Sequence, residues 1–190
     1  MTFEEIIAQD NAATFGGRLI VNTLRGRYIE SAVTLATPTI RRMLPVDCWG
    51  WDACDPRGLR LEVKHAAALQ AWPTQIQKCS FKIAGRREYF DPTIGGKMIP
   101  TQLTRYAQIH IFAHHPRDDG SADQREIDQW DFYLVATGEL PEMTGKPGQA
   151  ISLLDVRHLA RRRVGISELG EAVGRLQKLI DPVPLSELRR

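Results

Sequence analysis

The chain has 190 residues, of which 43% are hydrophobic and 25% are charged, and its net charge is only +2. This composition is ordinary for a soluble globular protein, and the length predicts one domain with a substantial hydrophobic core. No apolar run reaches about 18 residues and the acidic N-terminus lacks a signal-peptide pattern, so we expect no membrane span and a cytoplasmic location.

The first elements in chain order are predicted to be helices. A short helix is expected over 2–9, and a longer one runs from an N-cap at Asn22 to about Ala36, before Pro38. Its apolar residues follow the helical period. Gly26 sits inside this helix at a cost of roughly 1 kcal/mol relative to alanine, one turn before Glu30, where it would leave room for a neighbouring strand.

A strand around 40–47 is expected to lead into a hairpin with strands at about 48–54 and 59–65. The turn Asp55-Pro-Arg-Gly58 suits a type I turn, and a left-handed Gly58 would add a G1 bulge. The ladder then pairs Asp55 with Leu59 and Asp52 with Glu62. A plain two-residue turn would instead place Asp52 opposite Leu61.

In the bulged register, Asp52, Glu62 and Lys64 lie on one face of the sheet, while Leu61 and Val63 point into the core. Two carboxylates this close repel each other unless a cation neutralises them, and Mg²⁺ typically takes one or two carboxylates and keeps several waters. A bound divalent ion can activate water and stabilise charge on a phosphate oxygen. The alternative is a solvated strand face with an ordinary Glu–Lys pair.

The Asp52…Glu62-Val-Lys64 spacing resembles the PD-(D/E)XK phosphodiesterase superfamily of restriction endonucleases, junction resolvases and repair nucleases. Residues 22–36 resemble its first helix, which often carries a glutamate near the metal, and 61–72 resemble the segment after the catalytic strand in uncharacterised bacterial members. The resemblance covers about residues 20–75 well and 100–140 loosely. It departs at Trp51, where the name-giving motif has proline.

This resemblance implies a restriction endonuclease-like α/β fold: a mixed β-sheet flanked by helices with an αβββαβ-type core, followed by C-terminal helices. The predicted single domain spans 1–190, with its core at about 20–140 and the helical part at about 151–181. Asp52, Glu62 and the Val63 carbonyl would hold Mg²⁺, with Mn²⁺ as a substitute. Lys64 would position or activate water, and Glu30 and Gln70 would assist.

Beyond the hairpin, the Ala-rich stretch 66–72 has helical propensity, 79–84 is a strand candidate and 91–100 reads as a long loop. Strands are expected at 106–113 and 130–136, with a polar loop at 114–129. Two helices follow, starting near Ser152 and capped by Ser167. They are expected to pack on the sheet or form a dimer contact, although they could mimic a helix-turn-helix.

Histidine and cysteine offer weak metal signals. His110 lies within a predicted strand, and the neighbours His114 and His115 would point to opposite faces of an extended chain, so we expect loop histidines there rather than a zinc site. Three cysteines without paired spacing indicate neither structural zinc nor a disulfide framework, and they are Cys48, Cys54 and Cys79.

Basic residues are clustered rather than abundant. A sequence pI near 8.5 is weak evidence for nucleic-acid binding, but at least one arginine cluster is expected to flank the cleft and contact phosphates. The clusters are Arg25 with Arg27, Arg41 with Arg42, Arg86 with Arg87, and Arg161 to Arg163.

The sequence therefore predicts a Mg²⁺-dependent DNA endonuclease, and a homodimer is reasonable for cutting both strands of a duplex. Two alternatives remain open. One is a catalytically inactive nuclease-fold subunit that binds DNA or serves assembly. The other is a structural protein whose acidic and basic strand face forms a subunit contact.

Overall fold

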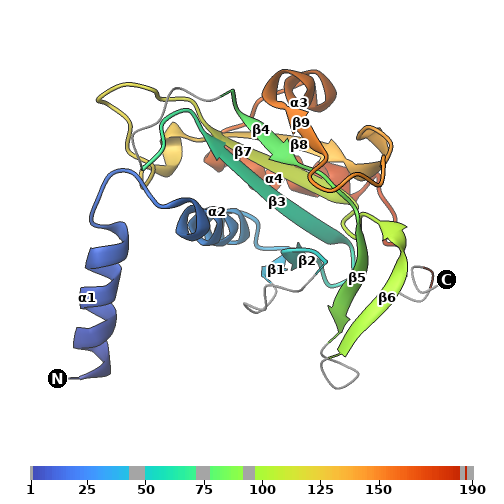
Figure 1. Ribbon diagram of the computed structural model, residues 1–190, viewed down its shortest axis with the longest axis horizontal. Helices are drawn as coiled ribbons and strands as arrows, with labels where there is room; N and C mark the ends of the chain where they lie inside the picture. The colour runs from blue at the N-terminus through green and yellow to red at the C-terminus, as the bar shows by residue number, and fades with distance from the viewer. Residues whose placement is uncertain (1, 43–49, 72–77, 92–96, 185–186, 188–190) are drawn as a thin grey trace.

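A computed structural model describes residues 2–42, 50–71, 78–91, 97–184 and 187. The chain is a mixed α/β protein (Figure 1). Within these described ranges the α-helices are α1 (Phe3–Phe15), α2 (Asn22–Ala36), α3 (Leu153–Ala160) and α4 (Ile166–Gln177), and 3₁₀ helices span Ile127–Gln129 and Thr137–Glu139. The strands are β1 (Arg41–Arg42), β2 (Ala53–Cys54), β3 (Arg60–Ala67), β4 (Ser80–Lys82), β5 (Arg86–Asp91), β6 (Lys97–Thr104), β7 (Ile109–His115), β8 (Asp131–Ala136) and β9 (Ala150–Ser152).

The main sheet has five strands in the order β1-β2-β3-β7-β8. The β3–β7 pair is parallel, and the other pairs are antiparallel. The sheet is therefore mixed, as predicted. Strand β7 lies between β3 and β8 and every residue of that strand is buried, which matches its nearly continuous run of apolar and histidine side chains.

Each face of the sheet carries its own hydrophobic cluster. Helices α2 and α4 pack on one face and α3 packs on the other, beside the small β4–β9 sheet (Figure 1). The two-residue strand period sends alternate side chains of β3 and β7 into these two clusters. The first contains Ile29, Val33, Leu61, Val63, Ile111, Leu169 and Val173, and the second contains Phe81, Phe112, Tyr133, Val135, Ile151 and Val156.

The N-terminal helix stands apart from both clusters. Helix α1 projects away from the sheet in Figure 1, and none of its residues is buried. It begins at a capping box in which Thr2 and Glu5 satisfy each other's backbone N–H groups. The helix predicted for 2–9 exists but continues to Phe15.

The connection between β3 and β7 differs from the prediction. The Ala-rich segment predicted over 66–72 is not a helix in its described part, 66–71, because Ala66 and Ala67 extend β3 and pair with His114 and His115 of β7. Of the predicted loop 91–100, Asp91 ends β5 and 97–100 belong to β6, which forms an antiparallel ribbon with β5, and 92–96 lie outside the described residues. The second helix expected for an αβββαβ core is not seen among the described residues of this connection, which contain strands β4, β5 and β6.

Several boundaries shift by a few residues. The N-cap of α2 is Val21 rather than Asn22, and α4 starts from Gly165 rather than Ser167. Ser152 does cap α3, accepting a hydrogen bond from the Asp155 N–H, and both C-terminal helices contact β8. The predicted strand at 40–47 is seen as β1, and its remainder, with Cys48, lies outside the described residues. No described helix has the length and apolar character that spanning a membrane requires.

Candidate active site

The hairpin before β3 has the predicted turn. Gly58 has φ +87°, a left-handed conformation that glycine adopts readily, and its N–H donates to the Asp55 carbonyl at 3.0 Å. The Asp55 carboxylate accepts from the backbone N–H groups of Arg57 and Leu59 and so fixes the turn. Strands β2 and β3 pair Cys54 with Arg60 and Ala53 with Leu61, which confirms the bulged register over the alternative.

Asp52 lies just before β2 and is held by two hydrogen bonds to β3. Its backbone N–H donates to the Leu61 carbonyl at 2.9 Å, and its Oδ2 accepts from the Val63 N–H at 2.7 Å. The N–H and C=O groups of one strand residue point to the same side. The Val63 carbonyl therefore also points toward the side of β3 occupied by the Asp52 carboxylate.

Glu62 and Lys64 share one face of β3, as predicted, and the Lys64 ammonium donates to Glu62 Oε1 in an ion pair. Their side chains are 10% and 26% exposed, so solvent screens this pair only partly. Leu61 and Val63 point to the opposite face, into the cluster shared with α2. The three predicted charged groups thus meet at one edge of β3.

Electrostatics at this edge reflect an excess of negative charge. Burial and the Glu62 carboxylate raise the pKa of Asp52 to about 7, against the smaller opposing effects of Lys64 and the Val63 N–H. Burial favours the neutral amine of Lys64, but the Glu62 and Asp52 carboxylates outweigh it and raise the Lys64 pKa. A divalent cation would relieve the repulsion that keeps Asp52 protonated near neutral pH.

The assisting residues predicted around this core have different positions. Glu30, on α2, lines the same cleft, and its charge contributes to the raised pKa of Asp52. Gln70 also lines the cleft, but its oxygen accepts from Arg25 at 3.2 and 3.3 Å and its Nε2 donates to the Ala67 carbonyl at 2.7 Å. These bonds hold the Gln70 amide, so its evident part is to position Arg25.

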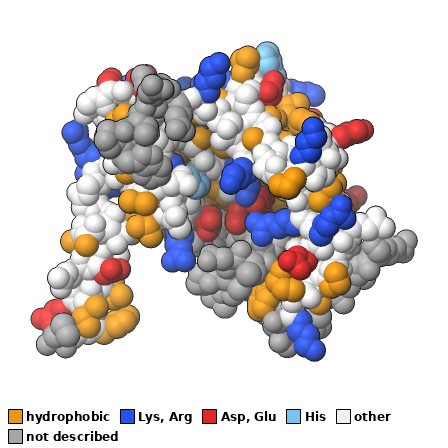
Figure 2. Space-filling model, in the orientation of Figure 1, with side chains coloured by type: hydrophobic (Ala, Val, Ile, Leu, Met, Phe, Trp, Pro, Cys, Tyr) orange, Lys and Arg blue, Asp and Glu red, His pale blue; other side chains and the backbone are white. Residues whose placement is uncertain are grey.

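The cleft measures about 610 Å³ and is lined by α2, β3, β4 and the start of β5. All six predicted site residues line it. Among the described residues that line it, five are basic and three are acidic, so the wall is net positive around the acids. The basic residues are Arg25, Lys64, Lys78, Lys82 and Arg86, and the acidic ones are Glu30, Asp52 and Glu62. Figure 2 shows acidic side chains in a hollow near the centre of this face, with Lys and Arg side chains around it.

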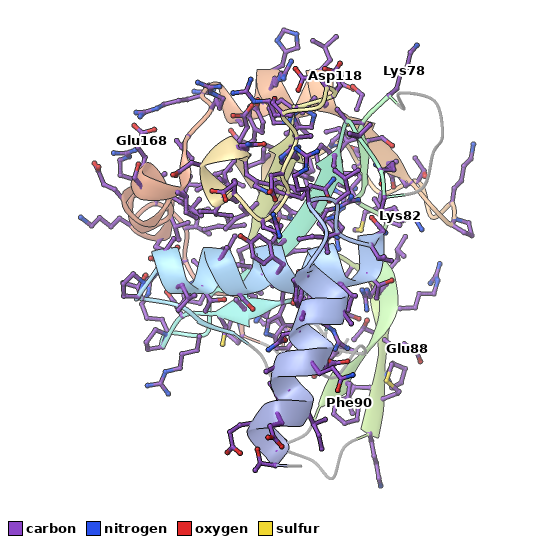
Figure 3. All side chains as sticks on the ribbon, turned by 90° about the vertical axis from the view of Figure 1, so that its left-hand side faces the viewer. Lys78, Lys82, Glu88, Phe90, Asp118 and Glu168 are labelled. Carbon is purple, nitrogen blue, oxygen red and sulfur yellow. The ribbon has the colours of Figure 1, made fainter. Side chains whose placement is uncertain are left out.

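Two of these basic residues were not anticipated from the sequence. Lys78 and Lys82 are exposed, and in Figure 3 they lie along the side that faces the viewer in Figure 1. Lys82 is the last residue of β4 and Lys78 lies two residues before that strand, which packs against β3. A lysine pair four residues apart gives no signal of this position in the sequence.

Among the predicted arginine clusters, those containing Arg25 and Arg86 reach the cleft. Arg25 is 1% exposed, and its guanidinium donates to Asn22, His65, Gln70 and Gln124. None of these four partners is acidic. The cluster at 161–163 is instead engaged in ion pairs with Glu139, Glu168 and Asp131.

The histidines of β7 are not loop residues. His110, His114 and His115 are buried strand residues, and the last two point to opposite faces as expected for neighbours. Burial lowers the pKa of His110 to about 3 and of His114 to about 4, so both are neutral at pH 7. Within the described part of the chain, no three His, Cys, Asp or Glu residues are grouped to hold a metal.

A candidate cation at the β3 edge must therefore rely on two carboxylates, the Val63 carbonyl and water. These are oxygen donors, which suit Mg²⁺ or Mn²⁺ rather than zinc. Burial first, and the neighbouring Glu62 carboxylate second, raise the pKa of Asp52, and a cation between the two carboxylates would lower it again. The residues present fit a hard divalent ion.

Gly26 brings α2 close to this edge. A Cβ atom on Gly26 would lie 2.9 Å from Nε2 of His65 on β3, which is closer than packing allows. We expect Gly26→Ala to lower the free energy of unfolding. The matched change Gly174→Ala, in α4 with open space around it, should raise that free energy by about 1 kcal/mol through helix propensity. Urea denaturation of both variants checks this, and an equal gain in the two would refute the close approach.

The Asp52 pKa predicts a pH dependence of stability without metal. The folded state holds the Asp52 proton up to about pH 7, whereas the unfolded chain releases it near 3.8. Rising pH across this window therefore destabilises the fold, by at most about 1.4 kcal/mol per pH unit. Asp52→Asn removes this term, so the unfolding free energy of the wild type relative to Asp52→Asn should fall from pH 4 to 7 and then level off.

The comparison with Asp52→Asn is needed because buried histidines act in the opposite direction. Three have folded-state pKa values lowered to about 3 or 4, so they destabilise the fold as pH falls below about 6.5; they are His65, His110 and His114. They are the same in both proteins and cancel in the difference. Urea titrations of both proteins in the presence of chelator, at intervals of one pH unit, measure this difference in unfolding free energy. A difference that does not change with pH would contradict the account.

Comparison with known proteins identifies no relative: no protein-family model, no curated protein and no solved structure matches this chain.

Proposed function

We propose that this protein is a Mg²⁺-dependent endonuclease that hydrolyses phosphodiester bonds in DNA, with Mn²⁺ as a substitute metal. The observation that carries the proposal is the convergence of the Asp52 and Glu62 carboxylates, the Val63 carbonyl and the Lys64 ammonium at one edge of β3, inside a cleft with a net positive wall. This combination supports metal-assisted attack on a phosphate better than a plain salt-bridged surface.

The fold assignment belongs to the same proposal. The order α2, β1, β2, β3, then β7 parallel to β3 and β8 antiparallel to β7, supports a restriction endonuclease-like core. The strands described between β3 and β7 would be a departure within that fold. A departure of this kind alters the connection but leaves the hairpin and β3, which carry the site, in place.

Each residue has a role that follows from its position. Asp52, Glu62 and the Val63 carbonyl would hold the ion, which when bound lowers the pKa of water and stabilises charge on a phosphate oxygen. Lys64, held by Glu62, would orient the attacking water and balance charge that develops on the phosphate. Glu30 would add negative charge near Asp52. Gln70 would fix Arg25 at the cleft wall.

The cleft also supports the choice of a polyanionic substrate. Five cationic side chains line it although the whole chain has a net charge of only +2. Positive groups concentrated around a small acidic centre attract a phosphate backbone and position it without reading sequence. DNA is therefore proposed as the partner, and a homodimer would supply two such sites for a duplex.

The direct test is to incubate the purified chain with Mn²⁺ or Mg²⁺ and a panel of supercoiled, linear, branched and single-stranded DNAs. We expect cleavage that requires the metal and stops with chelator. DNA binding without cleavage in any metal would overturn the enzyme assignment and favour the inactive DNA-binding subunit. Absence of both metal binding and DNA binding at low salt would favour a structural role for the charged strand face.

A further inference from the structure

A second, smaller cavity of about 230 Å³ adjoins the cleft. The two share four lining residues, so Glu62 and Lys64 face both spaces; the shared set is Glu62, Lys64, Lys82 and Arg86. The rest of its wall comes from the segments 83–85 and 104–107, with Gly50 and His110. The proposed chemistry does not use this cavity. Its volume is several times the roughly 30 Å³ share of one water molecule.

The charge in this cavity is strongly one-sided. Among the described residues that line it, four are basic, namely Lys64, Lys82, Arg86 and Arg105, and one, Glu62, is acidic. Glu62 is already paired with Lys64. His110 is neutral at pH 7, since burial lowers its pKa to about 3, and adds no charge to this wall.

Arg105 is the informative member of this set. Its Nε donates to the Ile83 carbonyl at 2.7 Å and its Nη1 donates to the Pro141 carbonyl at 2.8 Å, so both partners are uncharged. Its Nη2 is buried and has no hydrogen-bond partner among the described residues. A buried guanidinium nitrogen without an acceptor is costly, and an anion is the group that would satisfy both its charge and its N–H bonds.

We propose that this cavity binds a phosphate group of the nucleic-acid substrate, next to the phosphate that is cut. Four cationic side chains in one cavity wall, one of them an arginine with an unsatisfied guanidinium N–H, suit an oxyanion with several acceptors, whereas a nucleobase would leave that charge unmatched. The inference rests on the proposed function for the identity of the substrate. Because the cavities share the Glu62–Lys64 wall, a phosphate held here fixes the position of the strand relative to the metal site.

The first test uses inorganic phosphate alone, titrated calorimetrically into the metal-free full chain at low ionic strength. We expect one saturable site per chain. Lys82→Gln should weaken it at least tenfold, whereas Lys78→Gln, which lines only the larger cleft, should leave it within twofold. No saturable binding, or equal affinities in the two variants, would overturn the proposal.

Arg105→Gln should also weaken phosphate binding, but its two bonds to backbone carbonyls make it a variant that could unfold. A thermal melt accompanies it for this reason. Lys82 is exposed and forms no described ion pair, so Lys82→Gln keeps its fold and carries the test alone.

The second test identifies the source of the phosphate, using Asp52→Asn to prevent cleavage and fluorescence anisotropy to measure DNA affinity. Duplexes carry a 5′-phosphate, a 3′-phosphate or neither, and a closed circle has no ends. If the cavity takes a terminal phosphate, DNA that lacks that phosphate should bind at least tenfold more weakly than DNA that carries it. Adding Lys82→Gln should abolish this difference between the two DNAs. If it takes an internal one, Lys82→Gln weakens binding to every DNA.

Either outcome supports the inference. If Lys82→Gln leaves the affinity for every DNA unchanged, the inference is wrong. Its failure is distinguishable from failure of the proposed function. Phosphate binding that depends on Lys82, in a chain that cleaves no DNA, would refute the nuclease and leave the phosphate site. If the chain cleaves DNA but Lys82→Gln changes neither phosphate binding nor DNA binding, the nuclease is supported and the phosphate site is refuted.

Discussion

Asp52→Asn is expected to abolish metal-dependent cleavage while the protein stays folded. The change removes one of two carboxylates that hold the proposed cation, but the amide oxygen can still accept the Val63 N–H. We expect Mg²⁺ affinity to fall at least about tenfold. Cleavage should fall by about a thousandfold, corresponding to about 4 kcal/mol of lost transition-state stabilisation. Calorimetric Mg²⁺ titration and single-turnover cleavage measure the two quantities.

The apo stability of this variant provides its control. Above pH 7, where the wild-type carboxylate is ionised beside Glu62, the metal-free variant should be at least as stable as the wild type. Loss of activity therefore could not be attributed to unfolding. Full cleavage in Asp52→Asn, or lost cleavage with unchanged Mg²⁺ affinity, would remove Asp52 from the metal site.

Lys64→Met is expected to separate metal binding from catalysis. Lys64 neutralises Glu62 in the absence of metal, and its ammonium competes with any cation for that carboxylate. Removing it should leave Mg²⁺ affinity unchanged or higher, because the two acids then repel more strongly. Cleavage should nevertheless fall by about 10²- to 10⁴-fold, the size of the contribution made by a positioned proton-transfer or charge-stabilising group.

The matched change Lys82→Met removes a cation from the same cleft that has no ion pair with the described acids. It should raise KM through weaker DNA binding and lower kcat far less than Lys64→Met does. Circular dichroism checks that both variants fold. If Lys64→Met loses Mg²⁺ binding together with cleavage, Lys64 supports the acids structurally, and if it keeps full cleavage, it has no part in the chemistry.

The hairpin could be predicted because its determinants are local. An Asp, Pro and Gly at fixed turn positions set the bulge, and the two-residue strand period then places Asp52, Glu62 and Lys64 at one edge. The core face of β3 followed from the same alternation. These inferences use only residues within a dozen positions of one another, and the structure agrees with them.

Predictions that required long-range information were wrong or incomplete. Ala66 and Ala67 favour a helix locally, but pairing with β7 extends β3 through them. Pro100 made the segment before it resemble a loop, whereas β6 is an edge strand, where a proline is tolerated. The cationic wall from Lys78 and Lys82 depends on β4 lying against β3, a contact with no local signal.

The polar network around Arg25 could not be seen from the sequence for a similar reason. Its partners His65, Gln70 and Gln124 lie 40 to 99 residues away along the chain and meet only where α2 crosses β3. Gln70 was expected to assist near the metal, a role that stays a prediction, and the structure adds the bonds of its amide to Arg25 and Ala67.

The most direct test of the central claim is a crystal structure of the protein with Mn²⁺, using anomalous scattering to locate the ion. The account predicts one anomalous peak at the edge of β3, coordinated by Asp52, Glu62 and the Val63 carbonyl, with water completing the shell. A peak elsewhere, or none at saturating Mn²⁺ while Glu62 remains bound to Lys64, would contradict it.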